Sequence, residues 1–130
     1  SNRVAVAQKR KRVFDRLEAM YMSTAQNLAT NPVLAGVMYS EDYFVEDKIL
    51  RKKVLEIQDE TLKTVAGILK EGMKTGEIAK KVRADDAALM IVGTVRIVIA
   101  RWRLSGYADD ISRNIGHVIR GFGKLLVSTH

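Results

Sequence analysis

Arg96 carries the sharpest chemical signal in this sequence, because its guanidinium interrupts an otherwise apolar stretch. An unpaired charge in apolar surroundings is very costly, so this side chain needs a partner. An internal ion pair with an acid such as Asp59 or Glu60 is the favoured interpretation, and the carboxylate of a bound ligand is the alternative. Arg101 and Arg103 lie near the expected end of the same helix, where the dipole favours cations, and we expect them to be structural.

The other ionisable residues form no pattern typical of catalysis or metal binding. The sequence has no cysteine, no Glu-x-x-His pair, no glycine-rich phosphate loop and no serine with a plausible base nearby. The acid pairs Asp85/Asp86 and Asp109/Asp110 fall at expected helix starts, where capping explains them. We therefore predict that the protein is not an enzyme and has no catalytic residue, metal site or cofactor.

A basic stripe follows the last apolar segment of the chain. Arg113, His117, Arg120 and Lys124 recur at spacings of four, three and four, which places them on one face of a helix. The simplest interpretation is a solvated face, and the alternative places His117 at the edge of a dimer interface.

The elements that must position these residues all read as helices. Apolar residues recur with helical spacing, Pro32 follows Asn31 at a helix boundary, Gly76 is placed to end a helix, and no alternating strand pattern occurs. The expected helices span residues 3–30, a short segment from Pro32, 45–75, 84–104 and 109–127. We predict an all-α fold of five to six helices in one domain, residues 1–130.

The composition and the distribution of charge bear on the location of the protein and on its partners. The chain has 130 residues, 47% of them hydrophobic, and a formal net charge of +7. Residues 1–16 carry six basic side chains and one acid, whereas residues 17–48 carry one basic side chain and five acids. The basic start, including Lys9 to Arg12, lies near a polyanion or is simply a solvated helix start. No apolar run reaches the roughly 18 residues of a membrane span, so we expect a cytoplasmic protein that does not cross a membrane.

The segment 84–104 is apolar on nearly every side, and such a helix must be buried on more than one side. In a chain of this length a second copy can supply part of that cover. Glycines at 116 and 123 fall on one face of the next helix, where small residues permit close approach. We therefore predict a homodimer with a four-helix interface formed by the last two helices, and a monomer with a well-covered central helix is the alternative. The predicted interface residues are Gly93, Ile97, Ala100, Trp102, Leu104, Ile115, Gly116, Ile119, Phe122, Gly123 and Leu126.

Residues 68–111, ILKEGMKTGEIAKKVRADDAALMIVGTVRIVIARWRLSGYADDI, carry a family likeness. They resemble the C-terminal ligand-binding and dimerisation domain of TetR-family transcriptional regulators, and NPVLAGVMYSED at 31–42 resembles the short helix and bend of one branch of that family. The matching positions, in order, are Glu71, Gly72, Gly76, Glu77, Ala87, Ala88, Gly93 and Trp102. The likeness covers most of the chain, but it does not include the family's N-terminal helix-turn-helix domain.

The resemblance implies the sensing half of a repressor. A small, largely apolar effector would enter a pocket among the helices and change the spacing of two DNA-reading heads. DNA would be bound only through the absent N-terminal domain, close to the basic start of this chain.

Residues suited to such a pocket combine adaptable methionines with tyrosine and threonine hydroxyls that orient a ligand. The predicted ligand-binding residues are Met20, Tyr21, Thr24, Met38, Tyr39, Phe44, Thr61, Met90, Thr94 and Arg96. Ordinary core packing is the alternative for each of them. For the whole chain, the alternative function is a helical protein–protein interaction module without a small-molecule ligand.

Overall fold

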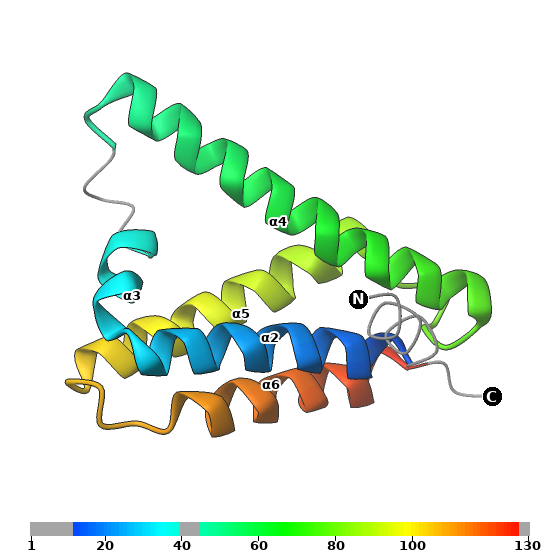
Figure 1. Ribbon diagram of the computed structural model, residues 1–130. Helices are drawn as coiled ribbons and strands as arrows, with labels where there is room; N and C mark the ends of the chain where they lie inside the picture. The colour runs from blue at the N-terminus through cyan, green and yellow to red at the C-terminus, as the bar shows by residue number, and fades with distance from the viewer. Residues whose placement is uncertain (1–11, 40–44, 128–130) are drawn as a thin grey trace, which may run out of the picture.

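The computed structural model describes residues 12–39 and 45–127 (Figure 1). Phe44 and the basic residues Lys9 to Lys11 lie outside the described residues. The helices are α2 (Val13–Thr30), α3 (Pro32–Met38), α4 (Lys48–Thr75), α5 (Ala84–Leu104) and α6 (Ile111–Leu126).

The all-α class is confirmed: the described residues contain no strand, and only an isolated bridge pairs Ile78 with Val127. The expected count of five to six helices is reached in the described residues only if the short α3 is counted as a helix of the fold. In the described part of the chain four helices of 16 to 28 residues form the body, whereas α3 is a connection of seven residues. Pro32 starts α3, which ends after about two turns.

Local signals in the sequence set most helix ends. The α4 helix begins where the Asp47 carboxylate accepts the N–H groups of Ile49 and Leu50, both at 3.0 Å, and it ends at Gly76, whose φ of 83° suits glycine. Asp110 accepts the N–H of Arg113 at 3.0 Å and so caps α6. The predicted bounds of α5, residues 84–104, match the structure.

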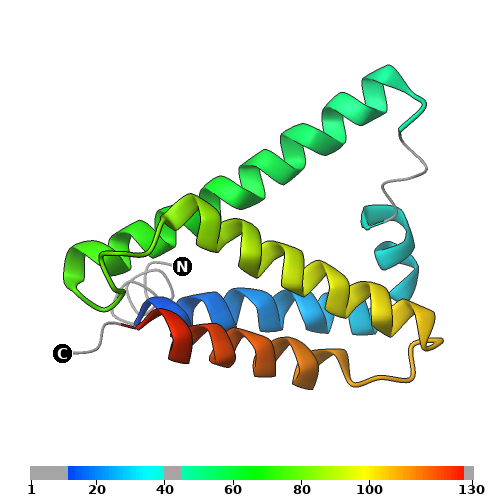
Figure 2. The same cartoon turned by 180° about the vertical axis from the view of Figure 1, so that it is seen from behind.

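The core lies between α2, α5 and α6 (Figures 1 and 2). The α2 and α6 helices run side by side, α5 packs on α6, and α4 packs mainly on α5 and also on α2. Leu17 from α2, Ile99 from α5 and Ile115 from α6 are fully buried there, and Leu69 brings α4 onto the same core. Burial of these branched side chains is the main force that holds the four helices together.

The α4 helix is packed along only part of its length. Its buried residues, Val65, Ala66, Leu69 and Gly72, all lie in the C-terminal half. Both views show its N-terminal end diverging from α2 and α5 (Figures 1 and 2). In this N-terminal half Val54 is half-buried and four apolar residues are exposed; the four are Ile49, Leu50, Leu55 and Ile57.

None of the helices in the described part of the chain has a stretch long and apolar enough to span a lipid bilayer. Nor do the described residues bring together three or more acidic or histidine side chains in a way that would hold a metal ion.

Candidate ligand cavity

A cavity of about 110 Å³ lies where α2, α3, α4 and α5 meet. Each of the four contributes to its wall, so residues far apart in the sequence face one space. The lining residues are Tyr21 from α2, Met38 and Tyr39 from the end of α3, Ile57, Gln58 and Thr61 from α4, and Val92, Val95 and Arg96 from α5.

The structure brings together five of the residues that the sequence suggested for ligand binding: Tyr21, Met38, Tyr39, Thr61 and Arg96. They reach the cavity because Pro32 turns the chain after α2 and directs the end of α3 towards α4 and α5. Met38 and Ile57 remain 58% and 63% exposed, so they form an apolar margin to the cavity.

Four other predicted binding residues lie elsewhere in the described chain. Met20 is half-buried against the core, and the Thr24 hydroxyl donates to the Met20 carbonyl at 3.2 Å. Met90 is 61% exposed, and the Thr94 hydroxyl donates to its carbonyl at 2.7 Å. The hydroxyls of both threonines therefore bond to their own helices, and neither threonine lines the cavity.

The binding prediction did not include Ile57, Gln58, Val92 and Val95, which also line the cavity. A spacing signal could have found part of this set. Ile57 lies one helical turn before Thr61, and Val92 lies one turn before Arg96, so each pair shares a face.

Tyr21 is the most enclosed polar residue of the cavity. Its side chain is only 6% exposed, and its hydroxyl has no hydrogen-bond partner among the described residues. Burial, with a further contribution from Tyr39, raises the pKa of Tyr21 to about 12. The hydroxyl therefore stays protonated at neutral pH.

Arg96 is half-buried, with its guanidinium carbon 5.2 Å from the centre of the Tyr39 ring. At this distance the cation is attracted to the ring face. Burial raises the pKa of Tyr39, and the positive charge of Arg96 opposes that shift. Asp59 and Glu60 are both exposed, and the ion pair of Arg96 with either acid stays a prediction.

A second surface of interest is the outer side of α5. Its inner side is buried, as Ile91, Val95 and Ile99 show. On the outer side Ile97 is 56% exposed and Leu104 is 87% exposed. Gly93 is exposed on the same side and Ala100 partly so.

The other predicted interface residues are covered to different degrees by the chain itself. Trp102, Ile115, Gly116 and Ile119 are buried, whereas Phe122, Gly123 and Leu126 are half-buried. A Cβ at Gly123 would lie 3.4 Å from Cγ of Phe14, and one at Gly116 would lie 3.5 Å from Sδ of Met22. Both glycines therefore face α2 of the same chain, at distances where a Cβ would make ordinary contact.

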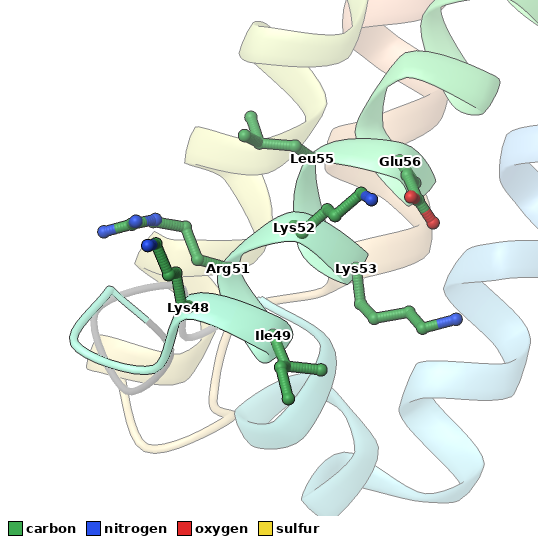
Figure 3. Close-up of a pocket in the computed structure, with 7 residues that line it drawn as sticks. All are labelled: Lys48, Ile49, Arg51, Lys52, Lys53, Leu55 and Glu56. Atoms are coloured by element: carbon green, nitrogen blue, oxygen red, sulfur yellow. The ribbon is translucent and has the colours of Figure 1, made fainter.

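A broader hollow lies at the start of α4, lined by Lys48, Ile49, Arg51, Lys52, Lys53, Leu55 and Glu56. All of these residues belong to one helix, and Figure 3 shows their side chains spread around it in different directions. Because they do not converge on a common point, we regard this hollow as solvated helix surface.

Comparison with known proteins agrees with this architecture. The chain is the C-terminal region of a TetR-type transcription regulator, which is a class of regulator and not of enzyme. Within that class it belongs to the family described as YsiA-like protein, C-terminal region, whose model matches residues 2–127. The resemblance noted in residues 68–111 is thereby confirmed.

The fold also resembles that of the fatty acid degradation regulator FadR from Bacillus halodurans, with a TM-score of 0.75 at 21% sequence identity. The match covers 92% of this chain and 62% of that protein, so the chain spans about three fifths of the length of the regulator it resembles. A search of the curated proteins gives no match.

Proposed function

We propose that residues 1–130 form the effector-sensing and dimerisation domain of a cytoplasmic TetR-type repressor, and that a small, largely apolar ligand binds in the cavity between α2, α3, α4 and α5. The observation that carries this proposal is the composition of the cavity wall. Met38, Ile57, Val92 and Val95 supply apolar surface, and the polar residues Tyr21, Tyr39, Gln58, Thr61 and Arg96 line the same space. Such a combination is typical of small-molecule sites.

A molecule with an alkyl chain is the first ligand class to test. FadR from Bacillus halodurans, whose fold this chain shares, is described as a regulator of fatty acid degradation. The exposed apolar side chains Met38 and Ile57 beside the cavity suit an alkyl chain that extends out of it. The ligand would act on DNA binding through a helix-turn-helix domain that lies outside this chain.

A homodimer completes the proposal. The exposed outer side of α5, with Gly93, Ile97, Ala100 and Leu104, is a continuous apolar stripe at helical spacing. Two copies related by a two-fold axis would cover this stripe on both chains at once.

The ligand test is a calorimetric titration with octanoate of the wild type and of Val92→Phe. The larger ring at position 92 fills part of the cavity, so we expect binding to weaken at least tenfold. Ala29→Phe, on the exposed surface of α2, is the matched control and should bind as the wild type does. If Val92→Phe binds octanoate as tightly as the wild type does, octanoate does not bind in this cavity.

The dimer test is light scattering over a dilution series. We expect a stable mass twice that of the chain for the wild type and for Ile49→Glu, and a monomer for Ile97→Glu. Both substitutions place a charge on an exposed isoleucine, but only Ile97 lies on the outer side of α5. A monomeric wild type that binds no alkyl ligand and captures a helical partner would favour the interaction module instead.

A further inference from the structure

Four segments of the chain meet at one end of the molecule. The link between α4 and α5 contacts two of the others directly: Glu77 accepts the N–H of Val13 at the start of α2, and the N–H of Ala79 donates to the carbonyl of Leu126 at the end of α6, at 3.1 Å. Both ribbon views show the start of α2, the end of α4 and the end of α6 together (Figures 1 and 2). We call this region the junction end; it comprises residues 12–13, 74–83 and 124–127.

Each segment of the junction end carries at least one exposed cation. Arg12 directly precedes α2, Lys74 lies in the last turn of α4, and Lys124 lies in the last turn of α6. Lys80 and Lys81 are neighbours in the link. Among the described residues none of these five forms an ion pair. Positive side chains from four segments are therefore in contact with water at one end of the molecule.

The acidic side chains around the junction end are mostly engaged by groups of the chain itself. The pairs are Glu71 with Arg16, Glu77 with the N–H of Val13, Asp85 with Lys70, and Asp86 with Arg83. Asp15, in the first turn of α2, has no such partner in the part of the chain that the structure describes. The unpaired cations thus outnumber the unpaired acid, and the potential at this end is positive.

A positive surface of this kind suits an extended polyanion. Because the five cations are distributed over four segments, they match a partner whose own charges repeat along its length. The phosphates of duplex DNA provide such a repeat, with one negative charge for every ~1.7 Å of the helix axis. In the sequence, Lys9 to Lys11 directly precede Arg12 and carry the positive charge further along the chain. The chain belongs to a family of transcription regulators, so DNA is the polyanion beside which it works.

The start of α4 offers a comparison, because it carries neighbouring cations in a different setting. Lys52 and Lys53 are exposed neighbours there, as Lys80 and Lys81 are in the link. Figure 3 shows Lys52 and Lys53 pointing in different directions from one helix, and this half of α4 has no buried residue. The junction end is held instead by the buried side chain of Ile78 and by hydrogen bonds between segments. A surface that is already fixed loses less conformational entropy when it binds a partner.

We propose that the junction end binds the phosphate backbone of duplex DNA, with Lys80, Lys81 and Lys124 among the side chains that contact phosphate. Contacts of this kind hold a protein on DNA without reading its sequence. Such a surface adds sequence-independent affinity to the sequence reading of the helix-turn-helix domain, through which alone the resemblance implied DNA binding. This contact depends neither on the ligand nor on the dimer.

The experiment measures binding of residues 1–130 to a short DNA duplex of arbitrary sequence, by fluorescence anisotropy at several salt concentrations. For the wild type we expect the affinity to fall steeply as salt is added. Lys80→Gln combined with Lys81→Gln should weaken binding about tenfold at low salt and reduce the salt dependence by about two phosphate contacts. Lys52→Gln combined with Lys53→Gln removes the same charge at the start of α4, and this matched control should bind nearly as the wild type does.

A second pair of substitutions tests whether the surface spans several segments. Lys74→Gln combined with Lys124→Gln removes one cation from the last turn of α4 and one from the last turn of α6, and it should also weaken binding several-fold. The Tm of each variant should be unchanged, because all of the substituted lysines are exposed. Wild-type affinity in this second pair would confine the contact to the link and overturn a surface formed by four segments.

Other results would also overturn the inference. Equal weakening by the substitutions at Lys52 and Lys53 would mean that binding follows the net charge of the chain and not the junction end. Equal affinity for polyglutamate of the same charge would assign the surface to an acidic protein. If the wild type does not bind DNA, the junction end is solvated surface, and that result is independent of the octanoate titration and the light scattering that test the proposed function.

Discussion

The two halves of α4 carry similar apolar patterns, yet only one half is packed. In the C-terminal half Val65 and Leu69 are fully buried, whereas in the N-terminal half Leu55 and Ile57 are 55% and 63% exposed. The packed half is also tied to the start of α2. The N–H of Val13 donates to both carboxylate oxygens of Glu77, at 2.8 and 3.1 Å, just beyond the end of α4.

The difference teaches that an amphipathic pattern shows which side of a helix must be covered, and not what covers it. The C-terminal half is covered by α5, α2 and Ile78. In the N-terminal half Ile57 lines the cavity and is still mostly exposed. We therefore expect this half to be the less stable part of α4, and to gain order when a ligand binds.

The largest effect is expected when one leucine in each half of α4 is replaced by alanine. Leu69→Ala should lower the free energy of unfolding by about 3 kcal/mol, because a fully buried leucine leaves a cavity behind. Leu55→Ala, where most of the side chain is already in water, should cost no more than about 0.5 kcal/mol. Urea unfolding at one protein concentration measures both values. Similar costs at the two positions would mean that the N-terminal half is packed after all.

Two glycine-to-alanine substitutions in α4 should change the free energy of unfolding in opposite directions. At Gly72 a Cβ would lie 2.8 Å from Cδ1 of Ile78 and 2.9 Å from Cγ2 of Val13, and both neighbours are themselves buried. Gly72→Ala should therefore destabilise the protein by about 1–2 kcal/mol. A Cβ at Gly67 would meet nothing within 4 Å, so Gly67→Ala should stabilise the protein by up to about 1 kcal/mol through helix propensity.

Thermal unfolding of the two glycine variants measures these changes, as a lower Tm for Gly72→Ala and a higher Tm for Gly67→Ala. Both glycines lie in the packed half, and a stabilised Gly72→Ala would show that this half is free to shift away from Ile78 and Val13.

The two helix caps provide a finer test. Asp47 caps the unpacked end of α4, and Asp110 caps α6, whose first residue Ile111 is buried. Loss of either cap should cost about 1 kcal/mol. For Asp110→Ala the loss should appear in global unfolding by urea, because the first turn of α6 belongs to the core. For Asp47→Ala it should appear mainly as faster amide hydrogen exchange near Ile49, and a full effect on global unfolding would contradict this view of α4.

Local features of the fold could be predicted from the sequence because their causes are local. The bounds of α5, the end of α4 at Gly76 and the cap at Asp110 each follow from a few neighbouring residues. The divergence of α4 could not be predicted, because its two halves have the same apolar period. Helical period defines a face, but the neighbour of that face depends on how distant segments pack.

The same limit applies to the candidate site. Tyr21 and Tyr39 were suggested by residue type, and both line the cavity. On α5, Met90 and Thr94 were suggested in the same way, but Val92 and Val95 line the cavity in their place. Because α5 is apolar nearly all round, its sequence gives little sign of which side faces α3 and α4. Gly116 and Gly123 were assigned to a dimer interface, but in the structure both face α2 of the same chain.

The smallest expected effect concerns charge on the packed half of α4. The Nζ atom of Lys70 lies 3.8 Å from a carboxylate oxygen of Asp85, and the two side chains are 60% and 81% exposed. An exposed pair of this kind contributes about 0–0.5 kcal/mol, so Lys70→Gln should barely change urea unfolding. The adjacent Leu69→Ala should be several times more costly, because burial and not charge holds this half of the helix in place. If Lys70→Gln costs as much as Leu69→Ala, and the cost falls with added salt, then ion pairing with α5 is what distinguishes the two halves.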